Sequence, residues 1–114
     1  MAMQSMINYQ PGDLVLIAFP YSAGAQTKNC PAMVLIDTGD ADLVVARVTT
    51  QPAQDEHDVV LSDWRNAGLL ASSTVRLHKL ATLEKSLVQR RLGCVQSKDR
   101  RAISKTVRRV YGTW

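Results

Sequence analysis

The feature that most constrains the fold is a series of short apolar segments separated by polar turns. Residues 14–19, 32–36 and 43–49 are each five to seven residues long, which is the length of a β-strand. Between the second and third segments the chain reads Asp-Thr-Gly-Asp, which is typical of a tight turn. We therefore expect these two segments to pair as an antiparallel hairpin. Further strands are predicted over residues 59–61, 73–83 and 87–95.

The strand predicted over residues 73–83 contains a break. Apolar and polar side chains alternate from Val75 to His78, and Leu80 then falls out of phase. A β-bulge near His78 and Lys79 would restore the alternation, and bulges are common beside functional surfaces. The other connections are predicted to be loops over residues 20–29 and 51–58, and a single helical turn, ended by glycine, over residues 62–68.

The C-terminal part of the chain has the pattern of one long helix. Ser97 is the expected N-cap, and Asp99 follows in the first turn, where a carboxylate favours helix formation. Ile103, Val107, Val110 and Tyr111 form an apolar stripe at helical spacing. Short strands followed by one helix predict a mainly β fold, a small antiparallel barrel with the helix packed on it. We expect residues 1–10 to be a flexible leader and residues 11–114 to form a single domain.

Composition excludes several classes of function. The chain has 114 residues, of which 46% are hydrophobic, enough for one core. No apolar run is long enough to cross a membrane and no signal peptide is recognisable, so we expect a cytoplasmic protein. Two cysteines make no disulfide framework, and no zinc-ligand spacing, P-loop or Rossmann fingerprint occurs. We therefore expect neither a cofactor nor a metal.

Charge is distributed unevenly along the chain. Up to residue 63 there are two basic residues and eight acidic ones, whereas twelve basic residues and two acidic ones follow. A basic second half suits a polyanion or an acidic partner. A helix whose arginines are simply solvated explains the same numbers equally well.

Four segments resemble one protein family. They are GDLVLIAFPY at 12–21, PAMVLI at 31–36, ARVTTQ at 46–51 and the longer stretch at 59–93, whose most specific part is VRLHKLATLEK at 75–85. Their order is similar to that in the MazF/PemK/Kid toxins, the RNA-cleaving toxins of type II toxin–antitoxin systems, over roughly residues 11–111. The resemblance implies an SH3-like barrel with a C-terminal helix, usually dimeric. It also implies cleavage of single-stranded mRNA without a metal or the ribosome, leaving a 2′,3′-cyclic phosphate.

The resemblance implies an active site that this chain matches only in part. Most family members carry an arginine immediately before the proline at position 31, and here that position is Cys30. The family threonine at the end of the third strand matches Thr49. A bidentate guanidinium suits the charge that develops on the phosphoryl oxygens when a ribose 2′-hydroxyl attacks phosphorus, and a neutral or anionic thiol does not.

Three explanations of Cys30 stay open. The protein is a degenerate toxin, or Lys28 supplies the missing charge, or the cysteine is a loss-of-function change tolerated because an active toxin kills its host. A small buried thiol with no chemical role fits Cys30 better than thiol catalysis does.

Further residues are candidates for RNA contact. Tyr21 can stack a splayed base, and Lys79, at the expected bulge, can contact a phosphate. Arg76 and His78 fit solvent-facing strand positions as well as they fit RNA contact. The full set of candidates is Tyr21, Asn29, Gln51, Arg76, His78 and Lys79.

Two classes of function follow. The first is a single-strand endoribonuclease toxin, impaired by Cys30. The second is a catalytically inactive PemK-like or CcdB-like module that binds an antitoxin, RNA or a protein target. In either case we expect a homodimer and a cognate antitoxin with an acidic, disordered segment that folds on binding.

Overall fold

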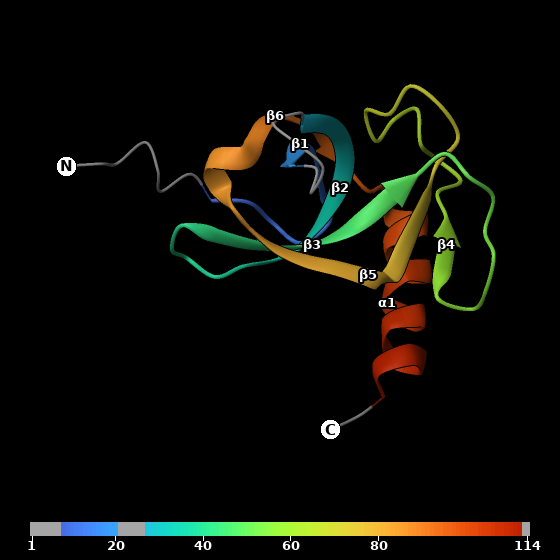
Figure 1. Ribbon diagram of the computed structural model, residues 1–114. Coiled ribbons are helices and arrows are strands. Elements are labelled where there is room, and N and C mark those ends of the chain that lie inside the picture. The colour runs from blue at the N-terminus through green and yellow to red at the C-terminus, as the bar shows by residue number, and fades with distance from the viewer. Residues whose placement is uncertain (1–7, 21–26, 113–114) are drawn as a thin grey trace.

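Six antiparallel strands and one C-terminal helix make up the fold in the computed structural model, which describes residues 8–20 and 27–112 (Figure 1). Every strand pair is antiparallel, and the strand order in the sheet is β4-β5-β3-β2-β1-β6. The mainly β fold predicted from the sequence is confirmed. The elements are β1 (Asp13–Pro20), β2 (Thr27–Asp37), β3 (Asp42–Thr49), β4 (Asp58–Val60), β5 (Thr74–Glu84), the 3₁₀ turn η2 (Lys85–Leu87), β6 (Val88–Cys94) and α1 (Ser97–Tyr111).

Apolar side chains form two clusters on the two faces of the bent sheet. The helix-side core contains Leu14, Met33 and Leu77, with Ile103 of α1 buried against it. The far core contains strand residues whose side chains point to the other face, among them Val15, and Tyr9 packs on it. Because side chains alternate along a strand, each central strand contributes to both clusters. α1 lies beside β4 and β5 in Figure 1, and the predicted apolar stripe is confirmed at Ile103 and Val107.

The segment between β4 and β5 lies directly against β6 and so brings the two edges of the sheet together. A Cβ placed on Gly68 would lie 2.1 Å from the carbonyl oxygen of Leu92, and one on Gly93 would lie 2.1 Å from that of Ala67. Only glycine allows backbones to approach so closely. The predicted turn over 62–68 ends at Gly68, where φ is +95°. It contains one α-helical hydrogen bond, from the Ala67 amide to the Asp63 carbonyl, and one 3₁₀ bond, from the Gly68 amide to the Arg65 carbonyl, both at 3.2 Å. The close approach of Gly68 to Gly93 joins the two edges and gives the open sheet its barrel-like shape.

The predicted bulge in β5 is confirmed. Ala46 of β3 pairs with Leu80, but the next residue, Arg47, pairs with Arg76. Residues 77–79 therefore have no partner on β3. The Leu77 amide donates instead to the carbonyl of His57 at 3.0 Å.

The start of α1 differs from the prediction. Gln96 occupies the N-cap position without a side-chain cap, and Ser97 is the first helical residue. Asp99 is buried, and its carboxylate accepts hydrogen bonds from the amides of Ser62 and Asp63, both at 2.9 Å, and from the Ser62 hydroxyl at 2.8 Å. The acidic residue thus anchors the turn over 62–68 to the helix, a role that local capping rules do not anticipate.

The beginning of β2 also differs from the prediction, which placed residues 20–29 in a loop. Lys28 and Asn29 are strand residues that pair with Phe19 and Ala18 of β1. Near the N-terminus, the Tyr9 amide donates to Asp37 at 2.7 Å, so this part of the expected leader contacts the sheet. Within the described ranges, no helix is long and apolar enough to cross a membrane.

Candidate active site

The three predicted catalytic residues lie on one face of the sheet. Cys30 pairs with Ile17 and Lys28 pairs with Phe19, and both of these β1 residues belong to the far core. Residues paired directly across two strands have their side chains on the same face. On the other side of β2, Ala32 pairs with Arg47. Thr49, two residues beyond Arg47, therefore faces the same way as Cys30.

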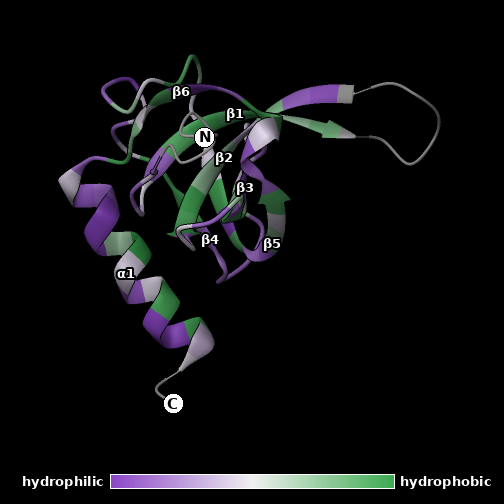
Figure 2. Cartoon of the chain, turned by 90° about the vertical axis from the view of Figure 1, so that its left-hand side faces the viewer, coloured by the Kyte–Doolittle hydropathy of each residue, from purple (hydrophilic) through white to green (hydrophobic). Residues whose placement is uncertain are grey.

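The ladder between β2 and β3 ends just before the candidate site. The last pair is Ala32 with Arg47, and continuing the same register by two residues would place Cys30 opposite Thr49. The strands are no longer hydrogen bonded at that point, whereas β3 remains paired with β5 through Thr49 and Thr74. Figure 2 shows the β1–β2 hairpin projecting beyond the rest of the sheet, with a hydrophilic beginning of β2.

Cys30 and Thr49 are half-buried, and Lys28 is exposed. The Thr49 hydroxyl oxygen accepts a hydrogen bond from the Gln51 amide at 3.2 Å. This contact leaves the Thr49 hydroxyl proton available for another acceptor. Among the described residues, no side-chain hydrogen bond or ion pair engages the Cys30 thiol.

Arg47 is a candidate that the sequence reasoning missed. It is exposed, and it lies on the same face as Cys30 and Thr49, directly opposite Arg76. Two arginines opposite each other repel, but Arg76 donates to the Asp58 carboxylate at 3.2 Å. In the described part of the chain no carboxylate pairs with Arg47. Its spacing from Thr49, two residues along a strand, is the signal that could have identified it.

The predicted RNA-binding residues are spread over different environments. Asn29 is exposed but one position from Cys30, so it faces the other side of the hairpin. Arg76 is held by Asp58, and its Nη2 lies 3.5 Å from Nε2 of His78 in the bulge. Lys79 and Gln51 are exposed. Tyr21 lies outside the described residues.

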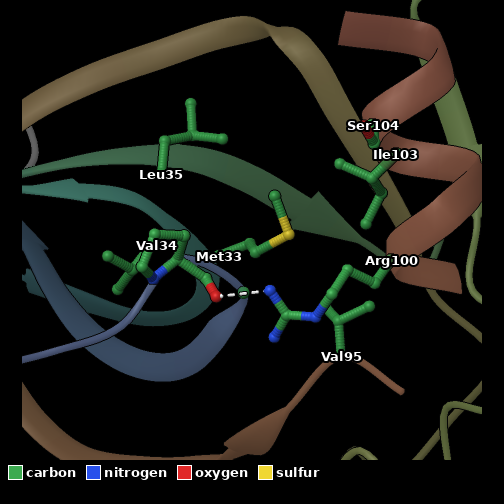
Figure 3. Close-up of a pocket in the computed structure, with 9 residues that line it drawn as sticks. Met33, Val34, Leu35, Val95, Arg100, Ile103 and Ser104 are labelled. Carbon is green, nitrogen blue, oxygen red and sulfur yellow. Dashed lines mark hydrogen bonds between the residues drawn. The ribbon is translucent and has the colours of Figure 1, made fainter. Parts of the chain in front are cut away.

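Two of the pockets in the described part of the chain do not include the polar residues of the candidate site. The larger, of about 460 Å³, is formed on the opposite face by residues that include Pro31, Thr50, Leu70 and Arg90. The smaller, of about 160 Å³, lies between α1 and the sheet and is lined mainly by apolar side chains (Figure 3). Arg100 borders it and donates to the Pro11 carbonyl at 2.9 Å. The larger pocket is therefore the one adjacent in sequence to Cys30 and Thr49.

Comparison with known families identifies the class of protein. The model of the PemK-like, MazF-like toxins of type II toxin–antitoxin systems matches residues 10–111. The chain belongs to this family, in agreement with the resemblance found in its sequence segments. No curated protein sequence matches the chain significantly.

Several solved structures have the same fold. A mycobacterial endoribonuclease described in complex with its cognate antitoxin is 19% identical, with a TM-score of 0.76 over 94% of this chain and 99% of that one. A second mycobacterial endoribonuclease is 18% identical, with a TM-score of 0.74 over 96% and 97%. The Mycobacterium tuberculosis toxin MazF-mt6 is 16% identical, with a TM-score of 0.68 over 88% and 99%. At these identities the similarity establishes the fold.

Proposed function

We propose that this chain is an endoribonuclease toxin that cleaves single-stranded RNA without a metal in the reaction. The observation that carries the proposal is the common orientation of Arg47 and Thr49 on adjacent same-face positions of β3, in a chain of the PemK-like toxin family. A guanidinium and a hydroxyl donor on one face can together bind two oxygens of a phosphate. We expect the protein to act in the cytoplasm, where mRNA is accessible.

The chemistry is an attack of a ribose 2′-oxygen on the adjacent phosphorus. The bond from the 2′-oxygen to phosphorus forms, and the bond from phosphorus to the 5′-oxygen breaks. The 2′-hydroxyl proton passes to solvent and the leaving 5′-oxygen takes a proton from solvent, giving a 2′,3′-cyclic phosphate and a 5′-hydroxyl. Thr49 donates a hydrogen bond to a phosphoryl oxygen, and the positive charge of Arg47 stabilises the negative charge that develops there.

Arg47 supplies, from β3, the kind of group that the family usually carries at position 30. Cys30 and Arg47 belong to neighbouring strands, because Ala32, two residues beyond Cys30, pairs with Arg47. Such diagonal neighbours are about 7–8 Å apart, which is within reach of an arginine side chain. Lys28, exposed on the same face, adds positive charge but not a bidentate donor. We expect the chain to be active but weaker than a variant with arginine at position 30.

An RNA cleavage assay tests the function directly. Purified protein is incubated with a long single-stranded RNA in EDTA, and the ends of the fragments are analysed. Arg47→Ala and Thr49→Ala should each lower the rate about 100- to 1,000-fold, the typical cost of one oxyanion donor. Arg65→Ala, at an exposed position between β4 and β5, is the matched control and should leave the rate unchanged. Cys30→Arg added to Arg47→Ala should recover activity.

If neither the natural chain nor a folded Cys30→Arg variant cleaves RNA, the endoribonuclease proposal fails. The alternative is then the inactive binding module, which Cys30 favours because a thiol cannot stabilise a phosphoryl oxyanion. If the chain is such a binding module, its affinity for an antitoxin, RNA or a protein target should be the same in the Thr49→Ala variant.

The partner we propose is an antitoxin with an acidic segment. α1 exposes a series of cations, which are Lys98, Arg100, Arg101, Lys105, Arg108 and Arg109. One structure with the same fold is described as an endoribonuclease with its cognate antitoxin, which supports this class of partner. Co-purification with the product of a neighbouring reading frame would test it, and reversing Arg101 and Lys105 to glutamate should weaken the complex. If no small acidic protein is encoded there or co-purifies, the proposal loses its support.

A further inference from the structure

The fold brings two histidines and one aspartate together at the edge of the candidate site. Asp55 and His57 lie in the segment between β3 and β4, and His78 lies in the bulge of β5. One possible ligand atom from each residue lies within 4.8 Å of those of the other two. His57 Nδ1 is 3.0 Å from the Asp55 carboxylate, and His78 Nε2 is 4.0 Å from it. The two imidazole rings are 4.7 Å apart, centroid to centroid.

The hydrogen bonds around the cluster show what must rearrange when a metal ion binds. Arg76 Nη2 lies 3.5 Å from Nε2 of His78, and a guanidinium can only donate. In the tautomer in which Nε2 accepts from Arg76, Nε2 has the lone pair that a metal ligand requires. Nδ1 of His78 is buried and has no hydrogen-bond partner among the described residues, so no such bond holds the ring in place. The amide and Nδ1 of His57 both donate to the Asp55 carboxylate, at 2.9 and 3.0 Å, so Nδ1 of His57 must lose its proton when it binds a metal ion.

We infer that Asp55, His57 and His78 form a binding site for a divalent transition-metal ion, with zinc the ion that fits best. Zinc binds imidazole nitrogen and carboxylate oxygen at about 2.0–2.2 Å, so tetrahedral ligand atoms are about 3.4 Å apart. The distances from the two histidine nitrogens to the Asp55 carboxylate, 3.0 Å to one oxygen and 4.0 Å to the other, bracket this value. Three protein ligands leave one position for water. Metal binding displaces Arg76 Nη2 from His78, while the Nε of Arg76 keeps its contact with Asp58 at 3.2 Å.

The site ties together segments that are distant in sequence. It connects the segment that follows Thr49 to the bulge of β5, on the face that carries Arg76. The sequence did not predict it, because the ligands do not have the spacing of a zinc motif. The inference does not depend on RNA cleavage, which the preceding assay measures in EDTA, so the two proposals can fail separately.

Calorimetric titration of the EDTA-treated, tag-free protein with zinc chloride tests the site. We expect one ion bound per chain, and visible absorption bands typical of low-coordinate cobalt when Co²⁺ replaces zinc. Asp55→Asn, His57→Gln and His78→Gln should each weaken binding at least tenfold. Glu84→Gln, an exposed acidic residue far along β5, should bind as the natural chain does.

Asp55 is exposed and His57 is partly exposed, so their variants should fold, and circular dichroism checks this. Absence of saturable zinc binding by the natural chain would overturn the inference. So would zinc affinity that stays within threefold of the natural value in all three folded variants, because the ion would then bind elsewhere.

Discussion

Replacement of Asp99 by alanine should destabilise the domain far more than its position in a helix implies. The Asp99 carboxylate is buried at the start of α1 and accepts three hydrogen bonds from Ser62 and Asp63. A hydrogen bond to a charged group contributes about 1.5–3 kcal/mol, and the three are not additive because the freed amides are partly rehydrated. We expect the free energy of unfolding to fall by about 3–5 kcal/mol. For a domain of this size that lowers Tm by roughly 12–20 °C.

The competing explanation is that Asp99 only complements the helix dipole. That effect is typically about 0.3–1 kcal/mol. Urea unfolding followed by circular dichroism distinguishes the two explanations, with Ser97→Asp added to Asp99→Ala as the matched control. Ser97 is exposed in the first turn, so its aspartate restores the dipole interaction but not the bonds to Ser62 and Asp63. A loss below about 1 kcal/mol, or full recovery with Ser97→Asp, would refute the anchoring role.

The same residue predicts how stability depends on pH. Burial acts to raise the pKa of Asp99, but the hydrogen bonds from Asp63 and Ser62 outweigh it, and the pKa is lowered overall. A carboxyl whose pKa is lower in the folded state stabilises the fold above its unfolded pKa, and the contribution disappears as pH falls through the folded pKa. The difference in unfolding free energy between the natural chain and Asp99→Ala should therefore be constant at neutral pH and shrink in acid, below an ordinary aspartate pKa of about 3.9. A difference that stays constant into strong acid would contradict this origin.

Three further outcomes follow from the packing. Gly68→Ala should cost about 1–3 kcal/mol more than Gly39→Ala in urea unfolding, because both have positive φ but only the Cβ at Gly68 would collide with a backbone, that of Leu92. Equal costs would show that φ alone matters. Tyr111→Phe removes the hydroxyl that donates to the Leu77 carbonyl beside the bulge, and it should lower the unfolding free energy by about 0.5–1.5 kcal/mol, whereas no change would show that water replaces the bond. Light scattering at micromolar concentration should give twice the chain mass of 12.6 kDa, since a homodimer is expected, and a monomer mass would count against it.

The regular parts of the fold could be predicted from the sequence because their own residues determine them. Short apolar runs bounded by turn residues predicted β1 and β3, and the loss of phase at Leu80 predicted the bulge. The beginning of β2 could not be predicted, because Thr-Lys-Asn-Cys has no apolar pattern. Its strand state depends on pairing with residues 17–20 of β1. Tertiary pairing of this kind overrides local propensity.

In the candidate site, the sequence predicted only those residues that can be identified one at a time, without knowing their neighbours in space. Thr49 and Cys30 follow from the family resemblance, since each occupies a recognisable place in the order of segments that resembles the family. The spacing of Arg47 and Thr49 along one strand places them on one face, but that Arg47 lies near Cys30 depends on the register of β2 with β3, which is a property of two strands. His78 reaches Asp55 only because the bulge of β5 lies beside the segment after β3.

The position of Cys30 predicts that arginine there is compatible with folding. Cys30 is only half-buried, and although it pairs with Ile17 on one side, the ladder to β3 has already ended on the other. A longer side chain can extend over the end of β3 toward solvent, where its charge is not buried. Repulsion from Arg47 opposes this, but like charges across strands cost only about 0.2–1 kcal/mol. The unfolding free energy of Cys30→Arg should therefore lie within about 1 kcal/mol of the natural value in urea. A variant that fails to fold would instead show that Cys30 is a core thiol, because an unpaired buried guanidinium is far more costly.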